Sequence, residues 1–434
     1  MVAETTRTHP KYTGTPVPET GILVRMSHSA GLADYRAALS TPGARGPALA
    51  SLLGRLPVAM VGISMLLYLR QTTGSYATAS MVSAATLIGL AIGSVAQGRI
   101  MDRIGPAHPL LITTALFAVF VAGTFAATES GAPTPVLVVL GVCVGTTEPV
   151  IASASRALWT RVTPVGPVRD AALTYEAISM EVFFILGPAI SGLLIAAPWP
   201  GTGLAIAAAA MVTGGVWFAL TPVIRDHRPE PGGHSGHLLG PLAAPGMRTL
   251  ALAAMGFGVV IGFVEVAVPA AATAAGNTPA GGLLMGLLSI SSVLFGVLYG
   301  LRPWPRAINL RLSALLGAFA VLVAILAIPT NLVWLALALL VVGTMVTPQA
   351  TTHSAAIELV APPNTATEAF GWVITAVTLG LALGQLVSGQ LVEHVGIWSS
   401  YLAATAIGMC FALAVYARRH TVEHEPTRLV SVAA

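Results

Sequence analysis

The sequence has few charged residues. Asp, Glu, Lys and Arg make up 9% of the 434 residues, and the mean hydropathy is +0.82. Soluble domains carry about 25% charged residues, so an ordinary soluble protein is excluded. Lysine occurs only at Lys11, and no Gly-x-x-x-x-Gly-Lys-[Ser/Thr] loop is present. The sequence therefore predicts that this chain does not bind and hydrolyse ATP through such a loop.

Groups of residues suited to metal or covalent chemistry are also scarce. The two cysteines, Cys143 and Cys410, lie far apart inside apolar runs, where we expect free packing residues. Histidines cluster only at His227, His234 and His237, among Gly and Pro residues that favour a flexible linker over a metal site. No Ser/His/Asp or zinc motif occurs, so we expect no enzyme activity, metal or cofactor. The basic pI of about 9.3 reflects membrane topology and not nucleic-acid binding.

Long apolar runs recur along the chain instead. Each is about twenty residues long, the length of a helix that crosses a bilayer. The pattern predicts an all-α integral membrane protein with twelve spans in two six-helix bundles. A short helix over 32–46 precedes the first span. We place the spans near 47–69, 77–98, 108–128, 135–158, 171–196, 202–221, 248–272, 279–300, 308–328, 332–356, 365–392 and 397–417.

Arginine positions set the expected orientation. If the N-terminus is cytoplasmic, the outer loops carry only Arg70. The inner segments then carry Arg99, Arg103, Arg161, Arg169, Arg225, Arg228, Arg248, Arg302, Arg306, Arg311, Arg418, Arg419 and Arg428. The positive-inside rule thus predicts that both termini lie in the cytoplasm. We expect the protein in the plasma membrane. The expected domains are a tail with a short helix (1–46), a first bundle (47–221), a linker (222–247), a second bundle (248–417) and a tail (418–434).

The two halves share sequence features. Gly145-Thr146-Thr147-Glu148-Pro149 in span four recurs as Gly343-Thr344-Met345-Val346-Thr347-Pro348 in span ten. Glu176-Ala177, with Gly192 sixteen residues later, recurs as Glu368-Ala369 with Gly384 sixteen residues later. Two related halves around a linker are typical of carriers that expose a central site to one side at a time.

A charged loop follows the second apolar run. It reads Gly98-Arg99-Ile100-Met101-Asp102-Arg103-Ile104-Gly105, and we expect Gly98 and Gly105 to allow a tight turn. The loop resembles the pattern Gly-x-Leu-x-Asp-Arg-x-Gly of the major facilitator superfamily. Gly98, Asp102, Arg103 and Gly105 match, Ile100 replaces Leu, and the two basic residues that close the family pattern are missing. The resemblance implies that this loop gates conformational change, with Asp102 acting near the start of span eleven.

Ionisable residues inside apolar runs mark candidate pathway residues, because a charge at membrane depth is costly. Glu148 and Arg156 of span four lie about 80° apart on a continuous helix, so the sequence indicates one face. Glu148 is a candidate proton carrier, with an internal ion pair as the alternative. Arg55 of span one either contacts an anionic substrate group or extends to the interface. Glu265 of span seven has no partner nearby in sequence and is our first candidate for coupling.

Span five holds further candidates. Glu176 and Glu181 are five residues apart and point in different directions, and Glu181 is a candidate partner for Arg156. The element Gly187-Pro188, followed by Gly192, resembles part of the span-five motif of drug/proton antiporters in the superfamily. Small residues permit close helix contact and Pro188 permits a kink, which predicts a helix pivot; ordinary tight packing is the alternative.

Tryptophans fall mostly near span ends, where interface anchoring explains them. This group contains Trp159, Trp199, Trp217, Trp304, Trp334 and Trp398. Trp372 lies inside span eleven and is a candidate for lining a substrate path.

Together these features predict a secondary transporter that works by alternating access, and the leading hypothesis is proton-coupled efflux of a small amphipathic compound. The alternatives are a proton symporter that imports a small metabolite and a membrane sensor or scaffold that transports nothing. A scaffold has little reason to keep an unpaired Glu265. The expected partners are the lipid bilayer, a small-molecule substrate and protons, and we expect a monomer.

Overall fold

The computed structural model describes residues 32–164, 166–226, 240–300, 307–362 and 366–422. Within helices, the side chains of single positions such as Asp102, Glu181 and Glu368 also lie outside the description. All regular structure in the described residues is helical, and twelve helical segments there are long and apolar enough to cross a membrane. The predicted fold class is confirmed.

The spans follow the predicted order with small shifts at their ends. A short helix, α1 (Leu32–Ser40), precedes them and ends earlier than the predicted helix over 32–46. The first six spans are α2 (Arg45–Arg55) with α3 (Val58–Thr73), α4 (Tyr76–Ile104), α5 (Ala107–Glu129), α6 (Thr134–Thr147) with α7 (Ile151–Val162), α8 (Pro167–Leu194) and α9 (Thr202–Leu220). The last six are α11 (Pro245–Ala274), α12 (Thr278–Gly300), α13 (Ile308–Ala324) with η2 (Ile325–Ala327), α14 (Leu332–Gly343) with α15 (Val346–Val360), α16 (Ala366–His394) and α17 (Ile397–Ala417). Short helices α10 (Pro222–Arg225), η1 (Gly240–Ala243) and η3 (Arg419–Val422) lie between and after them.

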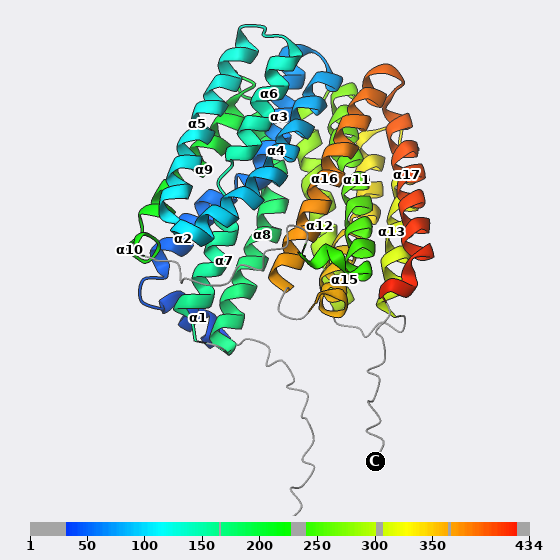
Figure 1. The fold of residues 1–434 in the computed structure, drawn as a ribbon. Helices are drawn as coiled ribbons and strands as arrows, with labels where there is room; N and C mark the ends of the chain where they lie inside the picture. Colours follow the sequence, from blue (N-terminus) through cyan, green and yellow to red (C-terminus); the bar gives the residue numbers. More distant parts are fainter. Residues whose placement is uncertain (1–31, 165, 227–239, 301–306, 363–365, 423–434) are drawn as a thin grey trace, which may run out of the picture.

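The helices form two bundles that stand side by side (Figure 1). In the first bundle α4 packs on α6 and α2 packs on α9, and in the second α11 packs on α16 and α13 packs on α17. Each bundle has its own apolar core, built around residues such as Met65 and Phe117 in the first and Phe263 and Phe319 in the second. The domain boundaries remain a prediction, because part of the linker lies outside the described residues.

The charged loop after the second span is shorter than predicted. Helix α4 continues to Ile104, and Gly105, at φ 88°, makes the turn into α5. Gly98 lies inside α4, and a Cβ added there would meet nothing within 4 Å. The prediction that Gly98 allows a tight turn is therefore wrong, since the helix continues past it to Ile104.

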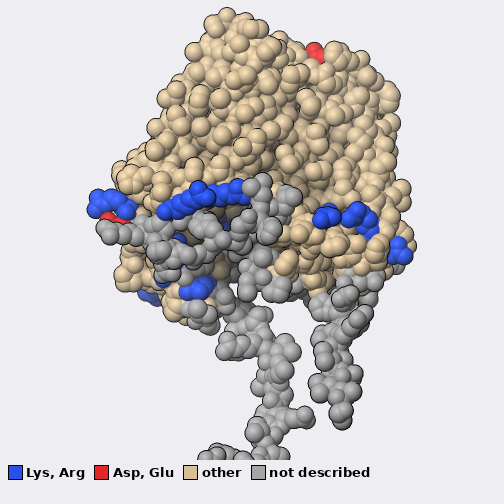
Figure 2. Space-filling view, in the orientation of Figure 1, with Lys and Arg blue, Asp and Glu red and all other residues tan. Residues whose placement is uncertain are grey.

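The two ends of the molecule differ in charge. Figure 2 shows basic side chains gathered near the end that carries α1, here called the α1 end, and a wide uncharged surface above them. Many apolar side chains of the spans are exposed, such as Ile112 and Val119 of α5 and Leu413 of α17. Exposed apolar side chains along the spans suit contact with lipid.

The bundles touch each other near the opposite end. Gly192 of α8 faces Gly282 of α12, where an added Cβ would lie 2.6 Å from the Gly282 Cα. At the start of α4 the Tyr76 backbone N–H donates to Glu393 Oε2 of α16 at 2.8 Å, and the Tyr76 hydroxyl donates to Thr273 Oγ1 of α11 at 3.0 Å. The carboxylate thus meets a free N–H at a helix N-terminus, where negative charge is favourable.

Enlarging Gly192 should open this contact. We expect Gly192→Val to force α8 and α12 apart, because the new side chain has no room beside Gly282. The readout is thiol labelling of a cysteine placed at Ser80, which packs against Gly389 in α16, in a background without Cys143 and Cys410. Labelling should rise several-fold.

The matched control is Gly62→Val, since a Cβ at Gly62 meets nothing within 4 Å. Equal labelling in the Gly192 and Gly62 variants would show that this contact does not hold the bundles together.

Candidate functional site

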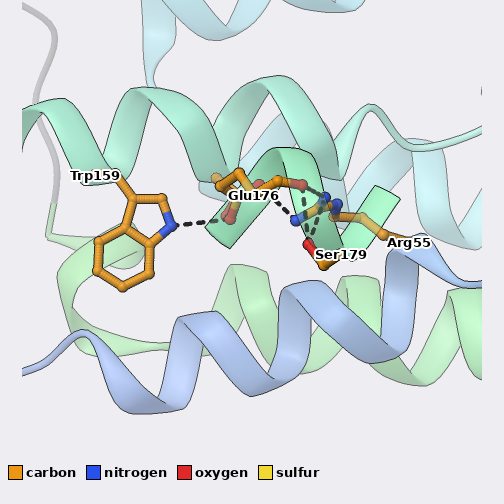
Figure 3. Close-up of polar contacts among 5 residues, drawn as sticks. Arg55, Trp159, Glu176 and Ser179 are labelled. Carbon is orange, nitrogen blue, oxygen red and sulfur yellow. Dashed lines mark hydrogen bonds and ion pairs between the residues drawn. The ribbon is translucent and has the colours of Figure 1, made fainter. Parts of the chain in front are cut away.

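A buried ion pair joins spans one and five in the first bundle. Arg55, the last residue of α2, donates from Nη1 to Glu176 Oε2 at 2.5 Å and from Nη2 to the Glu176 backbone oxygen at 2.7 Å. Nη2 also donates to Ser179 Oγ at 3.1 Å. The other carboxylate oxygen of Glu176 accepts from Ser155 Oγ at 2.7 Å and from Trp159 Nε1 at 2.8 Å, both on α7 (Figure 3).

The charges of Arg55 and Glu176 neutralise each other within this cluster. Both oxygens of the Glu176 carboxylate have partners, and the side chains of Arg55 and Glu176 are each 1% exposed. A buried ion pair recovers its desolvation cost only when its remaining hydrogen-bonding groups are also satisfied, as they largely are here. The cluster therefore ties spans one, four and five together as a neutral unit.

Two predictions are corrected by this cluster. Arg55 neither extends to the interface nor stands free for an anionic substrate, because Glu176 neutralises it inside the bundle. Trp159 is fully buried and binds Glu176, so it is not an interface anchor. Sequence reasoning missed the pair because Arg55 and Glu176 lie 121 residues apart.

Span four is interrupted at its middle, where Glu148 lies. Helix α6 ends at Thr147 and α7 begins at Ile151, so backbone groups between them lose their helical partners. Gln97 of α4 replaces those partners. Its Nε2 donates to the backbone oxygens of Thr146 and Glu148 at 3.0 and 2.9 Å, and its Oε1 accepts from the Val150 N–H at 3.3 Å. Such replacement allows a broken helix at membrane depth.

The Glu148 carboxyl itself has no comparable partner. It is 4% exposed, and among the described residues no group donates a hydrogen bond to it and no cation lies beside it. The interruption also changes its relation to Arg156. The predicted 80° angle assumed one continuous helix, whereas Arg156 lies on a separate segment and is exposed.

Span ten is interrupted at the corresponding place. Helix α14 ends at Gly343 and α15 begins at Val346, within the repeat that the sequence shows. Here Ser292 of α12 performs the role of Gln97: its Oγ accepts from the Thr347 N–H at 3.1 Å and bonds the Thr347 hydroxyl at 2.7 Å. The sequence repeat therefore marks paired helix breaks.

Glu265 finds its partner on a neighbouring helix. Gln385 of α16 donates from Nε2 to Glu265 Oε2 at 2.7 Å. The Gln385 Oε1 is buried and has no donor among the described residues. No cation of the described residues lies beside Glu265, which is half-buried. Val266 and Ala270, on the same helix, pack into the core of the first bundle, so Glu265 lies close to the boundary between the bundles.

A second polar pair in this bundle was not predicted. Gln349 and His353 of α15 contact each other through Nε2 atoms 3.2 Å apart, and both side chains are buried. The His353 ring stacks edge-on against Phe257 of α11 at 5.9 Å. The spacing of four between Gln349 and His353 was the available sequence signal, because residues four apart share a helix face.

The remaining candidates are placed as follows. The side chains of Glu181, Glu368 and Asp102 lie outside the described residues, and Arg103 is exposed. Trp372 is half-buried in α16.

In α8, Gly187 packs closely against Ala59 of α3, and Gly192 packs against the other bundle. These contacts agree with close helix packing, and the pivot itself stays a prediction.

Metal-binding groups do not assemble in the part of the chain that the structure describes, where no three His, Cys, Asp or Glu residues are placed to hold an ion. The histidines of the linker lie outside that part.

Breaking the Arg55 pair should destabilise the protein. Arg55→Met leaves a buried carboxylate without its counter-ion and should lower the free energy of unfolding by about 3–5 kcal/mol. The double variant Arg55→Met, Glu176→Met removes both charges and should recover most of this loss. Thermal unfolding of the purified protein reports the three values.

The control is Arg225→Met, because the pair that Arg225 forms with Asp226 has side chains 65% and 69% exposed. It should change Tm little. A double variant as unstable as Arg55→Met alone would show that the pair contributes through packing and not through charge.

Comparisons with known proteins agree with this architecture. A variant of the nucleoside transporter NupG superposes with a TM-score of 0.70 at 15% identity, covering 87% of this chain and 99% of that one. A variant of the peptide transporter POT gives 0.69 at 12% identity, covering 90% and 98%. The human organic anion transporter MFSD10 gives 0.58 at 15% identity, covering 86% and 99%. At these identities the likeness shows the fold.

No match was found among curated protein sequences. The family model described as Major Facilitator Superfamily matches residues 48–367. The family and its structural neighbours indicate a membrane transporter and not an enzyme. The protein belongs to the Major Facilitator Superfamily.

Proposed function

We propose that the protein is a proton-coupled carrier that exports a small amphipathic compound by alternating access. The observation that carries the proposal is the state of two acidic residues at membrane depth. Glu148 and Glu265 have no cationic partner among the described residues, whereas Arg55 and Glu176 neutralise each other. An unpaired carboxyl in lipid is costly as an anion and favours taking up a proton.

The arrangement of the bundles supports alternating access. Contacts between the bundles at Gly192 and Tyr76 lie near the end opposite α1. Glu265 lies near the boundary between the bundles, where a change in its charge acts on both. A carrier that rocks between two states needs such a group close to the surface that opens and closes.

Orientation and direction are part of the proposal. Basic side chains gather near the α1 end (Figure 2), which supports a cytoplasmic location for that end in the plasma membrane. Export rests on the resemblance of Gly187, Pro188 and Gly192 to the antiporter motif. The neighbours carry nucleosides, peptides and organic anions by their names, so they do not favour one substrate. Import of a metabolite with protons is the competing direction.

Replacing Glu265 and Glu148 by neutral residues should separate proton coupling from the movement of substrate. In proteoliposomes, Glu265→Gln and Glu148→Gln should abolish accumulation driven by a pH gradient, because Gln keeps the shape but cannot carry a proton. Substrate exchange without a gradient should continue in both variants when the substrate is supplied at saturating concentration. The measurement is flux with and without a pH gradient across a panel of drugs and metabolites.

Glu129→Gln serves as the control, since Glu129 is exposed and bonded to Tyr68 and Trp199 at the edge of the first bundle. Gradient-driven flux that is unchanged in both acid variants would remove them as proton sites.

A further inference from the structure

The charges at membrane depth are unevenly balanced. In the described residues, the guanidinium of Arg55 is bound by Glu176, Ser179 and a backbone oxygen, and it is 1% exposed. Among the described residues, Glu148 and Glu265 have no counter-ion. The described part of the interior therefore holds acidic groups in excess, and Arg55, which is buried there, is already neutralised. A substrate that carried a negative charge into this interior would meet uncompensated carboxyls.

Gln385 presents a buried acceptor that lacks a donor among the described residues, next to the carboxylate of Glu265. The amide of Gln385 is oriented by its bond from Nε2 to Glu265 Oε2, and its carbonyl oxygen is left to accept a different donor. That oxygen is buried without a partner among the described residues, and Gln385 is 4% exposed. A buried acceptor without a donor is destabilising, because it has lost its hydrogen bonds to water and gained none in return. A ligand with two or more N–H groups would satisfy this oxygen and the carboxylate together.

The helices hold this pair firmly. Gly262 of α11 lies against the backbone of Gln385, where an added Cβ would be 3.0 Å from the Gln385 nitrogen. Close backbone contact of this kind fixes the relative position of α11 and α16, so the acceptors are arranged before a ligand arrives.

Apolar side chains border the boundary between the bundles on the α1 side. Ile185 and Ala189 of α8 approach Gly286 of α12. One and two turns further toward the α1 end, the same faces continue as Val182 and Ile178 on α8 and as Ile290 on α12. These three side chains are 42%, 53% and 40% exposed. An apolar molecule fits this border better than a fully polar one.

We infer that the substrate is an organic cation, an apolar body that carries an ammonium or a similar group with several N–H donors. Glu265 and Gln385 bind the charged group, and the apolar border of α8 and α12 contacts the body. This inference rests on the proposed transport function and adds the chemical class of its substrate.

The test measures binding to the purified full-length protein by calorimetry at constant pH. The probes are 4-phenylbutylamine, 4-phenylbutanol and 4-phenylbutyrate, together with the naphthyl compounds of the same three types. Within the phenyl series and within the naphthyl series, only the terminal group of the molecule changes. We expect each amine to bind at least about tenfold more tightly than the alcohol and the acid of the same series. A hydrogen bond to a charged group is stronger than one between neutral groups by about this factor in binding.

Variants locate the binding. Glu265→Gln and Gln385→Leu should each weaken amine binding by about tenfold or more and leave the alcohols unaffected. Glu129→Gln, which removes an exposed carboxyl at the edge of the first bundle, should bind amines like the parent protein. Arg156→Gln removes an exposed arginine of α7, which is where an anion would bind if the inference is wrong.

Each other outcome overturns the inference. It fails if no amine binds, if amines and alcohols bind equally, if Glu265→Gln binds amines normally, or if the acids bind best and lose affinity in Arg156→Gln. Flux in proteoliposomes separates this inference from the proposed function. Amines that bind but never move contradict transport alone, whereas flux of a neutral or anionic compound that amines do not inhibit contradicts only the cation class.

Discussion

Lipid offers no hydrogen bonds, and this constraint governs the structure. Every backbone group or charge placed at membrane depth needs a partner from the protein itself. The interruptions of spans four and ten would each expose backbone groups, and Gln97 and Ser292 on adjacent helices supply the missing bonds. The same requirement explains why Glu176 collects Arg55, Ser155 and Trp159 around it.

Where the constraint is not met, the structure holds polar groups that can bind a proton or a ligand. Glu148 and the carbonyl of Gln385 lack partners among the described residues, and Glu265 has one neutral donor. The first bundle thus holds a closed polar cluster around Glu176, and the second holds an open one around Glu265. A closed cluster keeps three helices together through any movement, while an open one can respond to a proton or a ligand.

The fold was predictable because its signals can be read directly from the sequence. Apolar runs indicate the twelve spans, recurring motifs indicate the paired halves, and Gly105 indicates the turn into α5. The site was harder to predict from the sequence, for two reasons. Partners such as Arg55 with Glu176, or Glu265 with Gln385, lie 121 and 120 residues apart, and nothing local indicates which helices meet. Helix interruptions also defeat angular arguments, as the supposed shared face of Glu148 and Arg156 shows.

The link between Tyr76 and Glu393 has a consequence for sequence change. Glu393 is bound by the main chain of Tyr76 and not by its side chain, so this bond survives replacement of Tyr76 by any amino acid except proline, which lacks the amide hydrogen. Sequence drift at position 76 can therefore remove the hydroxyl that reaches Thr273 and still keep the bond to Glu393. Substitution of Tyr76 therefore preserves this hydrogen bond, whereas substitution of Glu393 removes the carboxylate that accepts it.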